Sequence, residues 1–196
     1  MAKLSMAAVF ESRLAVMVKA SATLVKMKRT KKLLIVICLL LIAGFLIPER
    51  RAIPVLGASS ADWNKDTFWY EPWGSSGVHK GVDVFAAEGT PVVASSDMII
   101  LFQGSLKKGG NVVVGLGAKW RLHYFAHLKE NSESAPLWVK SGEKIGEVGV
   151  TGNAKGKPAH LHYSLVSLVP LPWLMDASTQ GYKKAFYLNP IEYFGY

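Results

Sequence analysis

The chain has 196 residues, which suits one domain with a modest core, and a formal net charge of +9. The positive charge is concentrated at the start: residues 1–32 contain eight Lys or Arg and one acidic residue, Glu11, whereas residues 33–196 carry only +2. Phosphate binding needs Lys and Arg clustered on a folded domain, so this distribution argues against a nucleic-acid partner. A single cysteine, Cys38, excludes an intrachain disulfide.

An uninterrupted apolar run of 15 residues covers positions 33–47, with basic residues on both sides. As a helix it would span about 22 Å, against about 30 Å of bilayer hydrocarbon. The length also suits the apolar region of a secretory signal. A helix buried in a soluble domain fits poorly, because the run has no polar face. We therefore predict one transmembrane or signal-anchor helix over residues 33–48.

The charge asymmetry orients this predicted anchor. The basic segment 1–32 is expected in the cytoplasm, and the chain after residue 48 is expected outside it. This predicts a single-pass protein of the inner (cytoplasmic) membrane with a periplasmic or otherwise extracytoplasmic domain. Met27 begins a basic stretch that is itself typical of such a signal. Residues 1–26 are therefore a candidate upstream extension of the start site.

The remainder of the chain has the pattern of a β-protein. Residues 49–65 mix Pro, Ala, Ser and Gly and predict a linker, and residues 66–196 predict the folded domain. Short β-rich runs alternate with glycine turns, and no 3.6-residue apolar period is evident between residues 66 and 166. The predicted strands are 90–95, 98–102, 111–116, 120–127, 144–149 and 160–166. We expect an all-β fold, namely an antiparallel, β-sandwich-like domain preceded by the N-terminal helix.

Histidines and one aspartate fall in patterns that suit a single metal site. On a strand, His160 and His162 project to the same face while Leu161 turns into the core. His79 and Asp83 have an even spacing that is compatible with one face of an extended segment. Zinc in hydrolases commonly takes three N or O ligands and leaves one position for water. His79, Asp83 and one histidine of the 160/162 pair supply such a set, and the residues alone leave open which one.

The remaining histidines are His127, His123 and the member of the 160/162 pair that does not bind the metal. His127 and the spare histidine of the pair suit the proton transfers of peptide hydrolysis, in which water loses a proton and a developing oxyanion needs a donor. The His-Glu-x-x-His motif is absent, which excludes the glutamate-base design built on it. His123 stands four residues before His127, so on a continuous strand it shares that face and lines the cleft, or else it is an ordinary, partly exposed residue. We leave His123 out of the predicted site.

A series of short motifs, together with the closing segment 188–193, carries a family resemblance that covers roughly residues 66–193. They are His79-x-Gly81-x-Asp83, Gly89–Ala94, Gly110–Val114, Phe125–Leu128, Gly142–Gly146, Val148–Gly152 and His160-Leu161-His162. In this order they resemble the motifs of the lysostaphin-type zinc endopeptidases, a family of cell-wall hydrolases. The resemblance implies a Zn²⁺ ion held by His79, Asp83 and His162, catalytic roles for His127 and His160, and a peptidoglycan peptide as substrate.

Three further features of the sequence can be compared with that family. Asn111 matches a family position near the site and is a candidate substrate contact. The stretch 129–140 is less regular than the family's usual connection, which we expect to reshape one wall of the groove. Ser164 stands where many members have Glu, and we expect this difference to affect substrate preference rather than activity.

These observations predict a membrane-anchored zinc endopeptidase that acts on peptidoglycan. The alternative is a non-catalytic domain of the same fold that binds peptidoglycan or activates other wall hydrolases. Such scaffolds usually lack some zinc ligands, whereas here all three ligand positions and both catalytic histidines match. A third class, a cell-wall binding module, would need no histidine cluster.

Overall fold

The computed structural model describes residues 13–19, 28–129 and 134–195. The chain divides into two units, Met1–Ala43 and Gly44–Tyr196. Residues 13–19 are helical, and helix α2 spans Arg29–Leu46, which includes most of the apolar run. Within the described ranges, no helix is both long and apolar enough to cross a membrane. The suggested start-site extension, residues 1–26, falls mostly outside the described residues.

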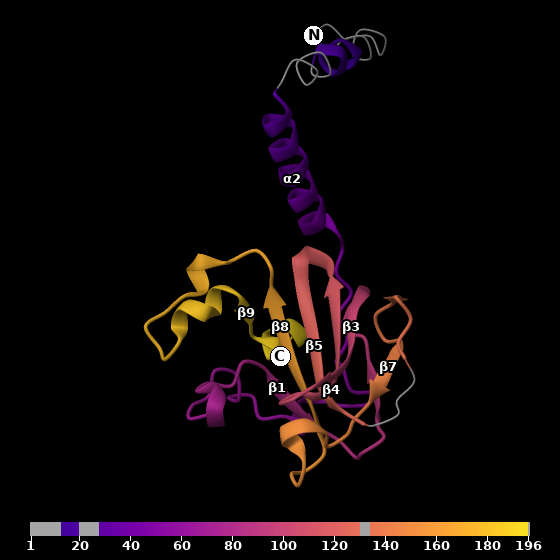
Figure 1. Ribbon diagram of the computed structural model, residues 1–196, viewed down its shortest axis with the longest axis vertical. Helices are drawn as coiled ribbons and strands as arrows, with labels where there is room; N and C mark the ends of the chain where they lie inside the picture. Colours follow the sequence, from indigo (N-terminus) through magenta and orange to yellow (C-terminus); the bar gives the residue numbers. More distant parts are fainter. Residues whose placement is uncertain (1–12, 20–27, 130–133, 196) are drawn as a thin grey trace, which may run out of the picture. The chain divides into compact units, whose positions relative to one another are not determined.

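Antiparallel strands form the framework of the unit Gly44–Tyr196 (Figure 1). The larger sheet has the strand order β1-β8-β5-β4-β3-β6, with β9 paired to β8, and a smaller sheet pairs β2 with β7. The strands are β1 Val82–Phe85, β2 Pro91–Val93, β3 Met98–Leu106, β4 Gly110–Gly117, β5 Arg121–Leu128, β6 Trp138–Val139, β7 Lys144–Glu147, β8 His160–Ser167 and β9 Tyr187–Leu188.

The predicted antiparallel β-fold is thus confirmed. Each of the six predicted strands overlaps an observed one, and every pairing between strands is antiparallel. The β-branched and aromatic side chains of β4 and β5 favour extended backbone, which explains why the sequence predicts these strands. The unpredicted strands β1, β6 and β9 have only two to four residues each.

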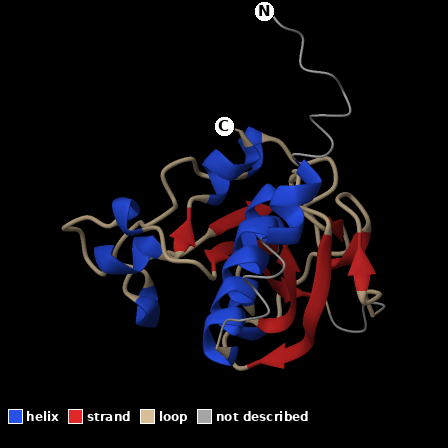
Figure 2. Ribbon diagram, turned by 90° about the horizontal axis from the view of Figure 1, so that it is seen from above, coloured by secondary structure: helices blue, strands red, loops and turns tan. Residues whose placement is uncertain are grey.

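Helical structure in this unit consists of short segments on the loops around the strands (Figure 2). Six 3₁₀ turns are described: η1 Ser60–Asp62, η2 Gly74–Ser76, η3 Ala118–Trp120, η4 Gly152–Ala154, η5 Pro172–Leu174 and η6 Gly181–Ala185. Helix α3 spans Pro190–Phe194. Asn189 caps its start by accepting a hydrogen bond from the Ile191 N–H, and Gly195, at φ 91°, ends it.

The two sheets share one hydrophobic core. Phe125 of β5 and Tyr163 of β8 are fully buried in it, together with Val92 of β2 and Ile145 of β7. In β8 the fully buried residues include Leu161, which lies between two histidines of the predicted site. The core therefore lies against one face of the larger sheet, and it leaves the other face of β1, β8 and β5 for the site.

The segment that precedes β1 also contributes to this core. Val55 and Trp63, which lie within the predicted linker, are only 2% and 6% exposed, and Val55 pairs with Val92. Burial of these two side chains ties residues 55–63 to the folded unit. The domain boundaries proposed from the sequence stay a prediction.

Candidate metal and catalytic site

Neighbouring strands bring the predicted site residues onto one face of the larger sheet. In the pairing register, Asp83 of β1 lies opposite His162 of β8, and His162 lies opposite Ala126 of β5. Directly paired residues of antiparallel strands point to the same side, so Asp83 and His162 project together. His160 stands two residues earlier on β8 and shares this side. His79 comes from the loop just before β1.

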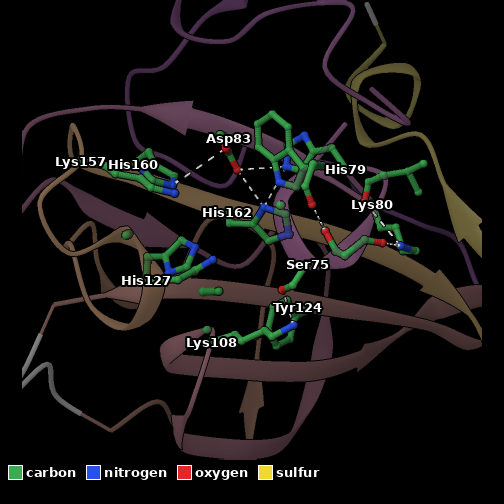
Figure 3. Close-up of a pocket in the computed structure, with 18 of the residues that line it drawn as sticks. Ser75, His79, Lys80, Asp83, Lys108, Tyr124, His127, Lys157, His160 and His162 are labelled. Atoms are coloured by element: carbon green, nitrogen blue, oxygen red, sulfur yellow. Dashed lines mark hydrogen bonds and ion pairs between the residues drawn. The ribbon is translucent and has the colours of Figure 1, made fainter. Parts of the chain in front are cut away.

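Three side-chain atoms converge at this point, as Figure 3 shows. His79 Nε2 lies 3.2 Å from Asp83 Oδ1 and 3.1 Å from His162 Nδ1, and the last two atoms are 2.8 Å apart. A tetrahedral zinc ion with bonds of about 2.0–2.1 Å holds its ligand atoms roughly 3.3 Å from one another. The three atoms lie close to that spacing, and their N, O, N chemistry suits zinc. The residues present therefore fit the metal.

The outer nitrogen of each candidate ligand histidine has a hydrogen-bond acceptor beside it. His79 Nδ1 lies 3.1 Å from the Thr67 carbonyl oxygen, which can accept a hydrogen bond from it. The Ser164 hydroxyl donates to the Lys80 carbonyl oxygen at 2.6 Å and so accepts from His162 Nε2 at 3.0 Å. With a proton on each outer nitrogen, the inner nitrogens, which now lie within hydrogen-bond distance of Asp83, are available to bind a metal.

Gly81 allows this close approach of β8 to the segment before β1. A Cβ atom at Gly81 would lie 2.5 Å from the Tyr163 carbonyl oxygen, 2.7 Å from Ser164 Oγ and 2.9 Å from His162 Cε1. Any larger residue would push the His162 ring and the Ser164 hydroxyl away from Lys80. The glycine of the His-x-Gly-x-Asp motif is therefore required by contact rather than by backbone conformation.

The side chain of Asp83 is mostly buried beside these imidazoles. Burial disfavours the charged carboxylate, but hydrogen bonds from His162 and His79 outweigh it and hold the pKa of Asp83 well below its usual range. Asp83 is therefore ionised at neutral pH and available as an anionic ligand.

His127 reaches the cleft through a β-bulge. The register between β4 and β5 shifts so that Asn111 pairs with Leu128 and Val113 with Phe125, which leaves one extra residue in β5. His127 itself has φ 64°, a left-handed conformation that is unusual for a residue other than glycine. Its N–H donates to the Gly109 carbonyl oxygen at 2.8 Å. The bulge turns the His127 side chain to the face of Tyr124 and Ala126.

The two imidazoles outside the metal triad are also held by backbone carbonyls. His127 Nδ1 donates to the Thr151 oxygen at 2.9 Å, and His160 Nδ1 donates to the Pro158 oxygen at 2.7 Å. Their ring centroids are 5.1 Å apart. Burial, together with the nearby His162 and His160, lowers the pKa of His127 to about 4. His127 is therefore neutral near pH 7, with an unprotonated Nε2 available as a proton acceptor.

A cleft of about 410 Å³ surrounds these groups. Trp73 forms part of its wall and stacks on the His79 ring, with 4.0 Å between centroids and 22° between planes. The lining includes His79, Asp83, His127, His160 and His162, together with Lys80, Lys108 and Lys157. The structure thus brings all five predicted metal and catalytic residues into one cavity.

Two other residues singled out in the sequence lie elsewhere. His123 is fully buried on the core face, with Nδ1 2.8 Å from both Ser95 Oγ and Tyr163 Oη, so it neither lines the cleft nor is partly exposed. Asn111 lines a separate hollow and donates its backbone N–H to Thr151 Oγ1. Its role as a substrate contact stays a prediction.

Several supporting residues were not identified from the sequence. Ser164 was expected to affect substrate preference, but the structure places it against His162. Strand alternation was a usable signal here, because Ser164 stands two residues after His162 and so shares its face. Thr67 and Thr151 lie in loops, where no periodicity predicts which way a residue faces.

The chain is similar in sequence to known peptidases. Residues 77–169 match the model of peptidase family M23. The chain is 42% identical over 86 residues to the DD-carboxypeptidase/endopeptidase Mpg of Neisseria meningitidis, a match covering 44% of this chain and 19% of Mpg. It is 31% identical over 113 residues to the L-Ala–D-Glu endopeptidase of Bacillus subtilis, covering 53% of this chain and 35% of the relative.

A solved structure shares the fold. Lysostaphin from Staphylococcus simulans superposes with a TM-score of 0.53 at 23% identity, over 71% of this chain and 50% of that one. The sequence matches cover about a fifth of the length of Mpg and about a third of the length of the Bacillus subtilis endopeptidase. Together the matches confirm the resemblance to the lysostaphin-type peptidases.

Proposed function

We propose that the chain, whose residues 77–169 match the model of peptidase family M23, is a zinc-dependent endopeptidase of that family and acts on peptidoglycan stem peptides or cross-links. The observation that carries the proposal is the convergence of His79 Nε2, Asp83 Oδ1 and His162 Nδ1 in a cleft that also contains His127 and His160. The names of the relatives support the substrate class, since they describe cleavage next to D-amino acids, which peptidoglycan stems contain.

The residues of the site would have two roles, metal binding and proton transfer. A zinc ion held by the triad would act as a Lewis acid and make water a stronger nucleophile near neutral pH. His127 and His160 each present an unprotonated Nε2, because Nδ1 donates to a backbone carbonyl oxygen. Either Nε2 can accept the proton that an attacking water loses. Once protonated, it can donate a hydrogen bond to the oxygen on which negative charge develops.

A non-catalytic scaffold of the same fold is the weaker alternative. A scaffold would need neither hydrogen-bond partners for the outer nitrogens of His79 and His162 nor a bulge that turns His127 toward the metal site. The left-handed backbone at His127 costs on the order of 1 kcal/mol or more, which is typical of residues held in place for function.

Attachment to the inner membrane through residues 33–48 is a separate part of the proposal. Its support is the sequence: a 15-residue apolar run with a basic flank on the expected cytoplasmic side. Alkaline extraction of membranes should leave the full-length chain in the pellet. Its release by alkali would contradict the anchor without bearing on the peptidase.

The enzymatic proposal can be tested with the purified full-length chain and purified sacculi. We expect soluble muropeptides whose masses identify a hydrolysed peptide bond, and no release by the His79→Ala variant or after chelation. If sacculi and isolated cross-linked muropeptides both remain intact while the chain carries zinc, the peptidase assignment is wrong.

A further inference from the structure

The catalytic cleft is lined by more positive than negative charge. Three of its lining residues are Lys80, Lys108 and Lys157, whereas the one acidic residue among its described lining is Asp83. Asp83 belongs to the metal triad, so a bound zinc ion would more than neutralise it. The substrate-facing charge of the cleft is therefore positive.

We propose that this cleft selects peptides with free carboxylates close to the scissile bond, and that Lys108 and Lys157 determine this specificity. The inference rests on the proposed peptidase function and names the substrate class of the same site. A neutral peptide, such as a chain of glycines, would gain nothing from these charges.

Lys108 is exposed on the turn between β3 and β4. Its Nζ donates one hydrogen bond, at 2.8 Å, to the hydroxyl of Ser75 on η2. An ammonium group has three donors, so two remain for a ligand. A carboxylate is also a better acceptor for an ammonium than a neutral hydroxyl is, so a bound anionic peptide can compete for this group.

Lys157 lies in the loop that leads into β8, and its side chain is exposed. Within the described part of the chain, the Lys157 side chain has no hydrogen bond or ion pair. Figure 3 shows Lys157 on the His160 side of His127 and Lys108 on the Tyr124 side. The two lysines thus lie on different sides of His127 in the lining of the cleft, where their side chains can reach carboxylates on either side of the bond that is cut.

Lys80 differs from this pair. Its Nζ donates to the carbonyl oxygens of Ser76 and Val78, and burial together with Lys183 lowers its pKa. It is engaged in holding the η2 loop, so we do not assign it to substrate recognition.

The positive charge continues beyond the cleft. The neighbouring hollow is lined by Lys107, Lys129 and Lys155 against one acidic lining residue, Glu88, and of these lysines Lys129 forms an ion pair with Glu147 at 3.8 Å. This concentration is local, because residues 33–196 together carry only +2. Charge gathered on one side of a nearly neutral domain favours the approach of anionic ligands and makes their binding sensitive to salt.

A matched pair of substrates provides the test. Cleavage by the full-length chain would be compared between a cross-linked muropeptide with free carboxylates and the same molecule after its carboxylates are converted to carboxamides. We expect kcat/KM to be about tenfold or more higher for the carboxylate form, and the difference to shrink as ionic strength rises.

Variants then assign the effect to residues. Lys108→Gln and Lys157→Gln should each lower kcat/KM for the carboxylate form about three- to tenfold and leave the carboxamide form unchanged. Lys140→Gln, which removes an exposed lysine outside the cleft, should leave both unchanged. Zinc content should be equal in all four proteins.

The outcomes separate this inference from the proposed function. If neither substrate form is cleaved, the peptidase assignment fails. If both forms are cleaved equally well, or if the two lysine variants lose activity on both forms alike, the peptidase stands and the carboxylate specificity is wrong.

Discussion

Strand β5 contains two histidines, His123 and His127, that lie on opposite faces of the sheet. His127 lines the cleft, whereas His123 is fully buried in the core beside Ser95 and Tyr163. On a continuous strand, residues four apart would share one face. The bulge and the left-handed backbone at His127 break that relation.

The difference teaches that backbone geometry, rather than spacing, assigns these two imidazoles their roles. Simple alternation places His123 on the core face with Phe125, and it would place His127 there as well. One extra residue turns His127 toward the metal triad, where its neutral ring can move a proton. Replacing His127 should therefore impair catalysis, whereas replacing His123 should lower the stability of the fold.

The largest expected effect is on catalysis at His127. His127→Ala should lower kcat about 10²- to 10⁴-fold, because it removes a group positioned for proton transfer. Zinc content should change little, since His127 lies outside the group His79, Asp83 and His162 whose atoms converge. Steady-state kinetics and elemental analysis of the same preparation check both statements. A variant that loses zinc along with activity would place His127 among the ligands instead.

His123→Ala should act on stability instead. It empties a fully buried site, which typically costs about 2–4 kcal/mol of unfolding free energy. Turnover per folded molecule should stay near that of the unsubstituted chain. Chemical denaturation and activity measured on the folded fraction give the two numbers. A large loss of turnover at unchanged stability would mean that the core face also takes part in catalysis.

A pair of serines on β8 sharpens the same contrast. Ser164 accepts a hydrogen bond from the proposed metal ligand His162, whereas Ser167 donates to the Val169 carbonyl oxygen, away from the site. Ser164→Ala should weaken zinc binding about 10- to 100-fold, because the His162 ring loses the partner that fixes its tautomer. Ser167→Ala should leave zinc affinity unchanged. Competition with a chromophoric chelator measures both, and equal affinities would remove Ser164 from its supporting role.

A smaller effect should follow from pH. Burial lowers the pKa of His123 to about 3, whereas the unfolded chain should protonate this residue near its ordinary value of 6.5. Below pH 6.5 the unfolded state binds a proton that the folded state does not. The free energy of unfolding therefore decreases as the pH is lowered from 6.5 toward the folded pKa. The expected slope is roughly 1.4 kcal/mol per pH unit.

The pH effect of His123 can be isolated by comparing unfolding free energies at pH 7 and pH 5 without metal. The chain should lose about 2 kcal/mol more than the His123→Ala variant over this interval. Identical losses in the two proteins would show that His123 does not titrate differently in the folded and unfolded states.

Sequence patterns predicted the strands that are long and regular, because side-chain alternation and β-propensity are local properties. They also placed His160 and His162 on one face, since that pair lies within an unbroken strand. His123 was left out of the predicted site, but its burial in the core was not predicted, because the bulge that separates it from His127 is set by contacts between distant segments, here the His127 N–H with Gly109. The two-residue strands β6 and β9 were missed for the same reason: pairing with neighbours, rather than composition, defines them.

The metal content of the purified full-length chain tests the central claim most directly. If His79, Asp83 and His162 hold the ion, elemental analysis should find about one zinc per chain. Asp83→Ala should remove it, and His127→Ala should retain it. A chain without stoichiometric zinc, or an Asp83→Ala variant that still binds it fully, would contradict the site described here.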